Sequence, residues 1–303
     1  MAIQREIWQD HIEGNLFKNN EFLLASTDAG QYVLQGKVVH IPQAGAAPNI
    51  VKNRTSLPGT IVQRTDTDIT YTLDEYTTDP ILIPYAETIE LSYNKRESVL
   101  GEYESSLKQT IADNLIFNWA VSGAGTFART TGDAVSSHLT GTTGNRKLFK
   151  AKDLKAAQLL LNKQNVPMEN RYALMSADMF QQLTDDLSVS EYRDFSTAYD
   201  AKDGVLGRLF GFKIMMRTGV VTYTNDTIPA LNSYGATPGT ADNDAVLCWH
   251  IDAVERALGD VKFFERVDDP TYYGSIYSAS VRIGGRKRRA DNKGVVALIQ
   301  AAA

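Results

Sequence analysis

A long stretch with helical periodicity places the strongest limit on how this chain can fold. Within residues 96–120, large apolar residues recur at every fourth position: Val99, Tyr103, Leu107, Ile111, Leu115 and Trp119. Just before and inside this stretch, Asn94 and Glu97 have the spacing of a capping box. About 25 residues at 1.5 Å each make a helix roughly 37 Å long. We therefore expect a rod that spans a whole domain and packs along its apolar side.

The remaining segments show both helical and strand patterns. A second helix is expected over residues 153–164, and Ser176 is placed to cap a third helix that continues through Leu183. Strands are expected in six further segments: 172–175, 209–221, 245–251, 261–267, 276–283 and 295–299. This mixture of helices and strands predicts an α+β fold.

A connection with little apolar content separates two strand-like segments, residues 37–41 and 69–73. Residues 42–59 contain three prolines and two glycines, but only Ile50, Val51 and Leu57 as large apolar residues. A connection of this length without a core of its own is usually functional or disordered. We expect it to lie outside the packed core.

Charge is segregated along the same part of the chain. Residues 36–65 contain the basic residues Lys37, Lys52, Arg54 and Arg64 and no acid. Residues 66–92 contain no base, and their acids are Asp66, Asp68, Asp74, Glu75, Asp79, Glu87 and Glu90. Two interpretations remain open: the blocks are solvated faces, or the basic loop docks on an acidic surface of another copy. In the second case the candidate contact residues are Lys52, Arg54, Arg64, Asp66, Asp68, Glu87 and Glu90.

A second basic group lies near the carboxyl end. Here six basic residues stand against Asp291, which gives a local charge of +5: Arg282, Arg286, Lys287, Arg288, Arg289 and Lys293. The group could face nucleic-acid phosphate, or it could be a solvated turn or an ion-pair patch between subunits.

Composition excludes several classes of protein. The chain has 31 Lys and Arg against 36 Asp and Glu, a net charge of −5, so bulk positive charge does not hold it on nucleic acid. Cys248 is the single cysteine, which excludes an internal disulfide and fits a reducing compartment. No apolar run approaches the roughly 20 residues of a membrane span, and the first residues lack a signal core. We expect a cytosolic protein that does not enter a membrane.

Motifs for catalysis and cofactor binding are nearly absent. Gly123, Gly125 and Ala128 match a dinucleotide-binding pattern, but they follow a helix where the motif requires a strand. The four histidines have no second ligand at helical or hairpin spacing. With 36 acids, a catalytic carboxylate pair stays possible, although no pattern singles one out. We expect no catalytic residue, no cofactor and no metal.

Several segments in a fixed order carry a resemblance to a known family. Residues 159–175 match a helix followed by Asn-Val-Pro, three residues, an arginine and an apolar strand, and residues 207–214 match the pattern G-x-i-x-G-f-x-v. Residues 294–299, Gly-Val-Val-Ala-Leu-Ile, follow two long strands. With the long loop, the stretch Ile-Pro-Tyr-Ala-Glu at 83–87 and the long helix, these features resemble the major capsid proteins of tailed bacteriophages, which have the Hong Kong 97-type fold.

The resemblance implies a division of the chain. Residues 1–35 are expected to form an N-terminal arm and residues 36–75 an extended β loop that reaches over a neighbouring subunit. Residues 76–145 and 259–303 are expected to form a peripheral domain, with residues 96–120 as its spine helix. Residues 146–258 are expected to form an axial domain, whose loops meet around five-fold and six-fold centres.

The resemblance also implies a function and partners. Many copies are expected to assemble as hexamers and pentamers into an icosahedral shell around double-stranded DNA, which is bound without sequence specificity. A portal at one vertex and a decoration protein are further expected partners. Because only about 35 residues precede the loop, where some members carry a scaffolding segment, we expect a separate scaffolding protein. Assembly is expected in the host cytoplasm, and the product is the virion.

Two alternatives remain at this point. The same fold could form an encapsulin-type compartment that loads protein cargo, or the chain could be an α+β enzyme with an unrecognised carboxylate pair.

Overall fold

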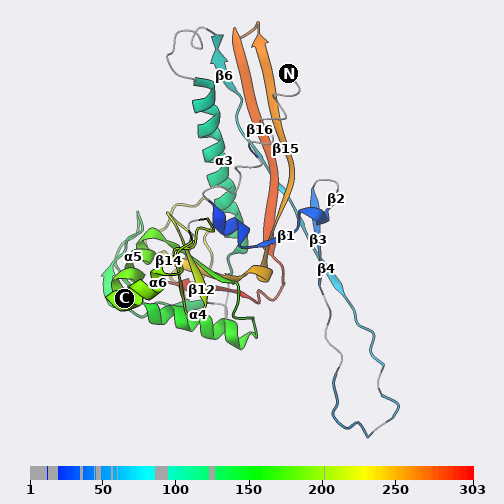
Figure 1. Cartoon of the computed structure of the whole chain (residues 1–303), viewed down its shortest axis with the longest axis vertical. Helices are drawn as coiled ribbons and strands as arrows, with labels where there is room; N and C mark the ends of the chain where they lie inside the picture. Colours follow the sequence, from blue (N-terminus) through cyan, green and yellow to red (C-terminus); the bar gives the residue numbers. More distant parts are fainter. Residues whose placement is uncertain are drawn as a thin grey trace.

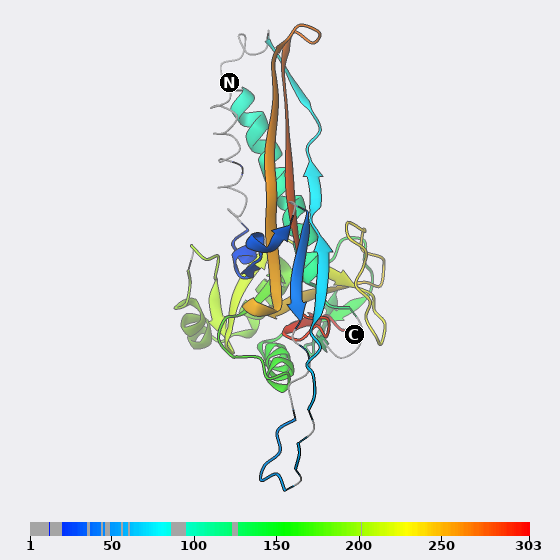
Figure 2. The same ribbon diagram turned by 90° about the vertical axis from the view of Figure 1, so that its right-hand side faces the viewer.

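The computed structural model describes residues 12, 20–34, 37–43, 45, 49–55, 57–59, 61–85, 95–122, 127–200 and 202–303. The described part is elongated (Figure 1). One long helix and two long strands form an upright part, a helix-covered sheet lies at its lower end, and a thin loop projects beyond that sheet (Figures 1 and 2). No helix in these described residues is long and apolar enough to cross a membrane.

The upright part consists of helix α3 (Lys95–Trp119) beside a five-stranded sheet. The long strands β15 (Val254–Asp269) and β16 (Gly274–Lys287) form an antiparallel hairpin at its centre. Three short strands complete the sheet: β1 (Thr27–Asp28) pairs with β15, while β5 (Asp74–Thr77) and β6 (Ile81–Pro84) pair with β16. The expected helix is therefore confirmed, and the two expected strands are longer than the sequence indicated.

The apolar stripe of α3 provides the packing between helix and hairpin. Leu107, Ile111, Leu115 and Trp119 are all buried, and the Trp119 indole Nε1 donates a hydrogen bond of 3.0 Å to the Glu255 carbonyl. A Cβ at Gly285 would lie 2.6 Å from Leu115 Cδ2, so only glycine allows the helix to approach the strand this closely. The end of α3 is thereby locked against the base of the hairpin.

The lower part is a seven-stranded sheet in the order β11-β12-β10-β14-β17-β7, with β13 also paired to β14. Its strands are β7 (Phe127–Arg129), β10 (Arg171–Ser176), β11 (Gly207–Leu209), β12 (Phe212–Arg217), β13 (Val221–Tyr223), β14 (Asn243–His250) and β17 (Val295–Ile299). Helices α4 (Ala151–Lys163), α5 (Ala177–Asp186) and α6 (Val189–Ser196) accompany it. Every residue of β10, β14 and β17 is buried, because both faces of this sheet are covered.

Alternate residues of the central strands face two different cores. In β14, Val246 and Cys248 pack with α4 and α5, while Leu247 and Trp249 pack with the α3 stripe. The Trp249 and Trp119 ring centroids are 5.8 Å apart. The seven-stranded sheet is therefore joined to the upright part through its own apolar core.

The expected division of the chain needs a correction at its carboxyl end. We expected residues 259–303 to lie together with the long helix, but β17 pairs with β14 and β7 in the seven-stranded sheet. The reason lies in the sequence Val-Val-Ala-Leu-Ile, which has no polar face and is stable only in a sheet covered on both sides. Helix α6 was not expected at all.

The N-V-P-x-x-x-R segment forms a tight turn between α4 and β10. Arg171 is 1% exposed, and its guanidinium donates to the carbonyls of Val166 and Pro167, both at 2.7 Å, and to Asn162 Oδ1 at 2.8 Å. Asn165 adopts a positive φ of 54°. The segment is a structural joint whose arginine satisfies carbonyls that the turn leaves without partners.

The remaining elements of the described residues are short. Strands β2 (Val33–Leu34), β3 (Val38–Gln43) and β4 (Thr67–Thr72) form a separate three-stranded sheet at the base of the projecting loop. Strands β8 (Ala134–Ser136) and β9 (Asn145–Lys147) form a small hairpin. Single turns of 3₁₀ helix among the described residues are η1 (Glu21–Leu24), η2 (Gly30–Tyr32) and η3 (Ile251–Ala253). Ser176 caps α5 as predicted, because its hydroxyl accepts from the Met179 amide.

The packing of α3 on the hairpin predicts a large effect of truncating its stripe. Leu115→Ala should lower the free energy of unfolding by about 3 kcal/mol, since it removes a fully buried side chain and leaves a cavity beside Gly285. Urea unfolding of unassembled subunits measures this loss. Ser105→Ala, at an exposed position of the same helix, is the control and should change the value by less than about 0.5 kcal/mol. Equal effects of the two substitutions would contradict the packing described here.

Candidate functional site

Most of the described residues in the projecting loop between β3 and β4 are exposed. It extends beyond the helix-covered sheet as a thin, open excursion (Figures 1 and 2). Four large apolar side chains on it are mostly exposed: Ile50 (92%), Leu57 (83%), Ile61 (98%) and Val62 (74%). Isolated surface apolar residues are ordinary, but several on one projecting loop mark an interaction surface.

The base of this loop is held by one carboxylate. Asp66 Oδ1 accepts from the Gly45 amide at 2.8 Å and from Arg64 Nε at 2.5 Å. These two hydrogen bonds hold the pKa of Asp66 below its ordinary value. A Cβ at Gly45 would lie 2.2 Å from the Thr65 carbonyl oxygen, so glycine is required where the two sides of the loop approach. His40 and Asp68 pair across β3 and β4 at 2.5 Å.

Three of the seven candidate contact residues thus have partners within their own subunit. Arg64 pairs with Asp66, and Asp68 pairs with His40. Lys52 and Arg54 lie exposed at the tip, and neither forms an ion pair with any residue that the structure describes. Glu87 and Glu90 lie outside the described residues. Among the candidates that the structure describes, Lys52 and Arg54 are therefore the ones whose charges have no ion-pair partner within the described residues.

Half of the six basic residues in the patch near the carboxyl end pair with acids inside the subunit. Three of its arginines pair with acids of the same chain: Arg282 with Glu75 (3.1 Å), Arg288 with Glu255 (3.3 Å) and Arg289 with Asp291 (2.8 Å). The hydrogen bond from Arg282 is the main reason that the pKa of Glu75 lies below its ordinary value. This arrangement favours a structural role over the binding of phosphate.

Two further patch residues donate to backbone carbonyls. Lys287 Nζ donates to the Ala120 carbonyl at 2.5 Å, and its burial lowers its pKa. Arg286 donates to the Thr70 carbonyl at 3.4 Å. Both contacts tie the end of β16 to elements that are far away in sequence.

The sequence did not predict the buried carboxylate of Glu255, which lies where the base of the loop meets the hairpin. Glu255 has a side chain only 4% exposed, and burial raises its pKa. Burial of Tyr71 itself on β4, together with the charge of Glu255, raises the pKa of Tyr71. Nearby, Gln43 Nε2 at the end of β3 donates to the Arg288 carbonyl at 2.5 Å. These contacts attach the base of the loop to the hairpin. The residues next to Glu255 in the sequence show no pattern that predicts them.

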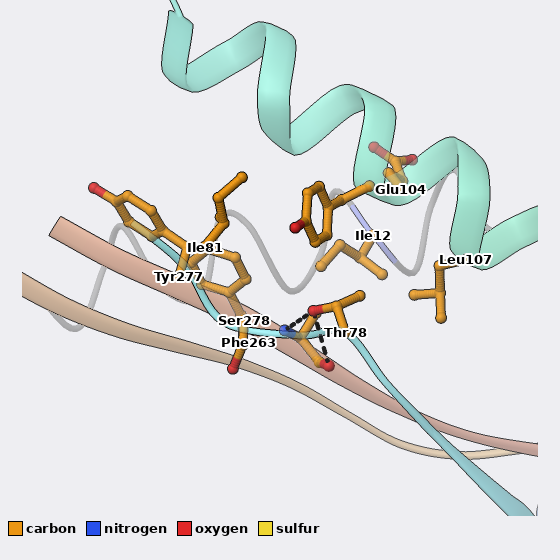
Figure 3. A pocket seen from close by; sticks show the side chains of 10 residues that line it. Ile12, Thr78, Ile81, Glu104, Leu107, Phe263, Tyr277 and Ser278 are labelled. Atoms are coloured by element: carbon orange, nitrogen blue, oxygen red, sulfur yellow. Dashed lines mark hydrogen bonds between the residues drawn. The ribbon is translucent and has the colours of Figure 1, made fainter. Parts of the chain in front are cut away.

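A small cavity lies between α3 and the hairpin (Figure 3). Leu107 of α3, Phe263 of β15, Tyr277 of β16 and Ile81 of β6 line it, together with Ile12 (Figure 3). Its volume is about 30 Å³, far below the roughly 300–1,000 Å³ of a small-molecule site. We interpret it as a packing defect of the core.

A serine, a histidine and an aspartate also meet in the seven-stranded sheet. Ser176 Oγ donates to Asp244 Oδ2 at 2.5 Å, and His138 Nε2 lies 3.0 Å from the same oxygen. In a catalytic triad the serine binds the histidine, whereas here both groups bind the carboxylate and Ser176 also caps α5. The cluster is a structural clamp.

Metal and thiol chemistry find no support in the described residues. No group of three or more His, Cys, Asp or Glu among them is arranged to hold a metal ion. Cys248 is completely buried, and burial raises its pKa to about 12, so the thiol is protonated and unreactive at neutral pH.

Comparison with known proteins identifies what this arrangement is similar to. The family model described as phage capsid protein matches residues 104–298, from within α3 to β17. The capsid structure of cyanophage P-SCSP1u is similar with a TM-score of 0.62 at 18% identity, covering 90% of this chain and 86% of that chain. The capsid of Ralstonia phage GP4 has a TM-score of 0.66 at 10% identity, covering 92% and 87%. No curated protein matches the sequence significantly. At these identities the structures establish a common fold.

The clamp at Asp244 makes stability depend on pH. Burial lowers the pKa of His138, but the hydrogen bond and charge of Asp244 outweigh this and raise it overall. The stabilisation is therefore complete below the ordinary histidine pKa, near 6.5, and is lost as pH rises through the higher folded value. We expect His138→Gln to lower the thermal midpoint more at pH 5.5 than at pH 8.5.

His250 serves as a control, because the pKa of His250 is shifted in the opposite direction to that of His138. Its pKa is lowered, chiefly by burial, so protonation on the acid side disfavours the folded state. His250→Gln should therefore lower the midpoint less at pH 5.5 than at pH 8.5. Parallel trends in the two variants would show that the Asp244 clamp does not control the pH response.

Proposed function

The chain belongs to the phage capsid protein family, its copies form the capsid shell of the virion, and from this premise we propose that the shell is icosahedral, is built from hexamers and pentamers, and encloses the double-stranded DNA of a tailed bacteriophage. The family match supports the shell, and the resemblance of the sequence to tailed-phage capsid proteins supports its symmetry and contents. The protein's work in this function is binding between copies, so its chemistry is that of interfaces and no catalytic step is required.

One observation carries the proposal at the level of residues: the projecting loop exposes apolar side chains that its own subunit does not cover. Ile50, Leu57 and Ile61 are each more than four-fifths exposed. Burying one such side chain contributes roughly 1.5–3 kcal/mol, so a neighbouring copy that covers the loop gains a substantial contact. A loop on one face that binds a different face of the next copy makes a heterologous contact, which closes into rings.

We propose the following division of labour within the subunit. The loop of residues 36–75 reaches over a neighbour, α3 and the long hairpin form the peripheral part, and residues 146–258 together with β17 form the axial part around the ring centres. The shared core at Trp119 and Trp249 supports this, because it would hold the two parts at a fixed angle.

Further partners are proposed from the resemblance alone: a separate scaffolding protein, a portal at one vertex and a decoration protein. For encapsidated DNA, the ion pairs inside the basic patch support weak contact without sequence specificity, because half of its six basic side chains are already paired with acids.

Electron microscopy of the expressed protein tests this function. The wild-type chain, expressed with its neighbouring genes, should form closed shells, whereas Ile61→Asp should leave the subunit folded and reduce shell yield at least about tenfold, since it places a charge in the covered surface. Circular dichroism verifies the fold of each variant. Ile228→Asp, in another exposed loop, is the matched control and should assemble. A stable monomer under all conditions, or normal shells from Ile61→Asp, would count against the proposal.

A further inference from the structure

A short N-terminal turn occupies the junction between the two large parts of the subunit. The turn η1 lies at the lower end of α3, where the upright part meets the seven-stranded sheet (Figures 1 and 2). Its Phe22 is buried in the same core as Trp119. The ring centroids of Phe22 and Trp119 are 6.3 Å apart, and the guanidinium of Arg217 on β12 lies 5.8 Å from the Phe22 centroid. One aromatic side chain therefore stands between α3 and a strand of the sheet.

Hydrogen bonds from both parts hold this turn in place. The buried guanidinium of Arg256 on β15 donates to the carbonyls of Leu23 (3.0 Å) and Ser26 (2.9 Å). Trp249 Nε1 of β14 donates to the Ala25 carbonyl at 2.7 Å. Because hydrogen bonds from a charged donor are stronger than neutral ones, the contact with Arg256 fixes the turn firmly. The turn is thus a packed insert that the hairpin and the seven-stranded sheet bind separately.

Beside this turn an open groove separates α3 from the sheet. The groove has a volume of about 770 Å³ and lies between α3 and the turn that follows β12, and its lining includes Asn20, the residue before η1. Arg217 crosses the groove: its guanidinium pairs with Asp113 of α3 and donates to the Gln109 carbonyl at 3.4 Å. The groove leaves space in which the two parts can approach or separate, and η1 is the packed element at its end.

We propose that η1 is a wedge that sets the angle between α3 and the seven-stranded sheet, with Phe22 as its packed edge and the pair of Arg217 and Asp113 as a tie across the groove. This inference rests on the proposed shell function, because five-membered and six-membered rings require the same chain at different angles. The wedge holds the angle within the range that both rings need. A small change in such a packed element moves a whole domain, since packed interfaces have discrete arrangements.

Distance measurements on the unassembled subunit test the wedge. Spin labels at Ser106→Cys on α3 and Lys163→Cys on α4, both exposed, report the separation of the two parts, and the buried Cys248 stays unlabelled. Phe22→Ala should widen the distance distribution at least about twofold, because it removes the side chain between the parts. Leu183→Ala, in the separate core packed by α4 and α5, is the control and should lower the thermal midpoint without widening the distribution. Equal widening in both variants, or none in Phe22→Ala, would overturn the wedge.

Two milder substitutions keep the test decisive if Phe22→Ala does not fold. Phe22→Leu retains an apolar side chain and should widen the distribution by a smaller amount, and an unchanged distribution would overturn the wedge. Asp113→Asn removes the charge of the tie at a side chain that is 45% exposed, so the core stays intact and the distribution should again widen. Its matched control is Glu102→Gln, at an exposed carboxylate of α3 outside the groove, which should change nothing. Equal distributions in these two charge variants would overturn the tie.

Electron microscopy of shells separates this inference from the proposed function. Shells of Phe22→Leu should spread in diameter at least about twofold more than wild-type shells, because the subunit enters rings at a wider range of angles. Uniform shells of wild-type size from a variant with a widened distance distribution would overturn the wedge as the element that sets the rings and leave the shell function standing. Failure of the wild-type chain to form shells would overturn the proposed function, whereas the distance distributions decide on the wedge independently.

Discussion

Trp119, at the end of helix α3, lies where this helix meets both the long hairpin and the seven-stranded sheet. Its indole donates to the Glu255 carbonyl of the hairpin, and its ring lies against Trp249 of the seven-stranded sheet. Gly285 allows this approach, because any side chain there would collide with Leu115 or with the backbone of Glu255. The angle between the upright part and the helix-covered sheet therefore depends on a small, fully buried seam.

Charge is used differently in the body and in the loop. In the body, basic side chains near the end of β16 are paired with acids of the same subunit or donate to its backbone, so they hold distant segments together. In the loop, Asp66 neutralises Arg64 at the base, and the tip keeps Lys52 and Arg54 free of ion pairs within the described residues. The net charge of −5 hides this arrangement, because a sum over the chain does not distinguish internal pairs from available charges.

The regular elements could be predicted because their patterns are local. The stripe of α3, the cap at Ser176 and the apolar run of β17 each contain the information that forms them. Helix α6 was missed because Phe195 is its one buried residue, which leaves no apolar stripe to detect. The position of β17 and the pairing of Arg282 with Glu75 could not be predicted, since both depend on contacts between residues far apart in sequence. The same reason applies to the candidate site. Composition predicted that the loop lies outside the core, but it could not predict which charged residues of the loop form ion pairs within their own subunit.

The projecting loop adds little to the core of its own subunit, and this separates two properties that most proteins must optimise together. A substitution at Ile50 or Ile61 changes no buried contact of the folded subunit, so its effect is confined to the strength of association. A lineage carrying this fold can therefore alter how tightly and how fast its particles close while the subunit's folding remains under separate selection.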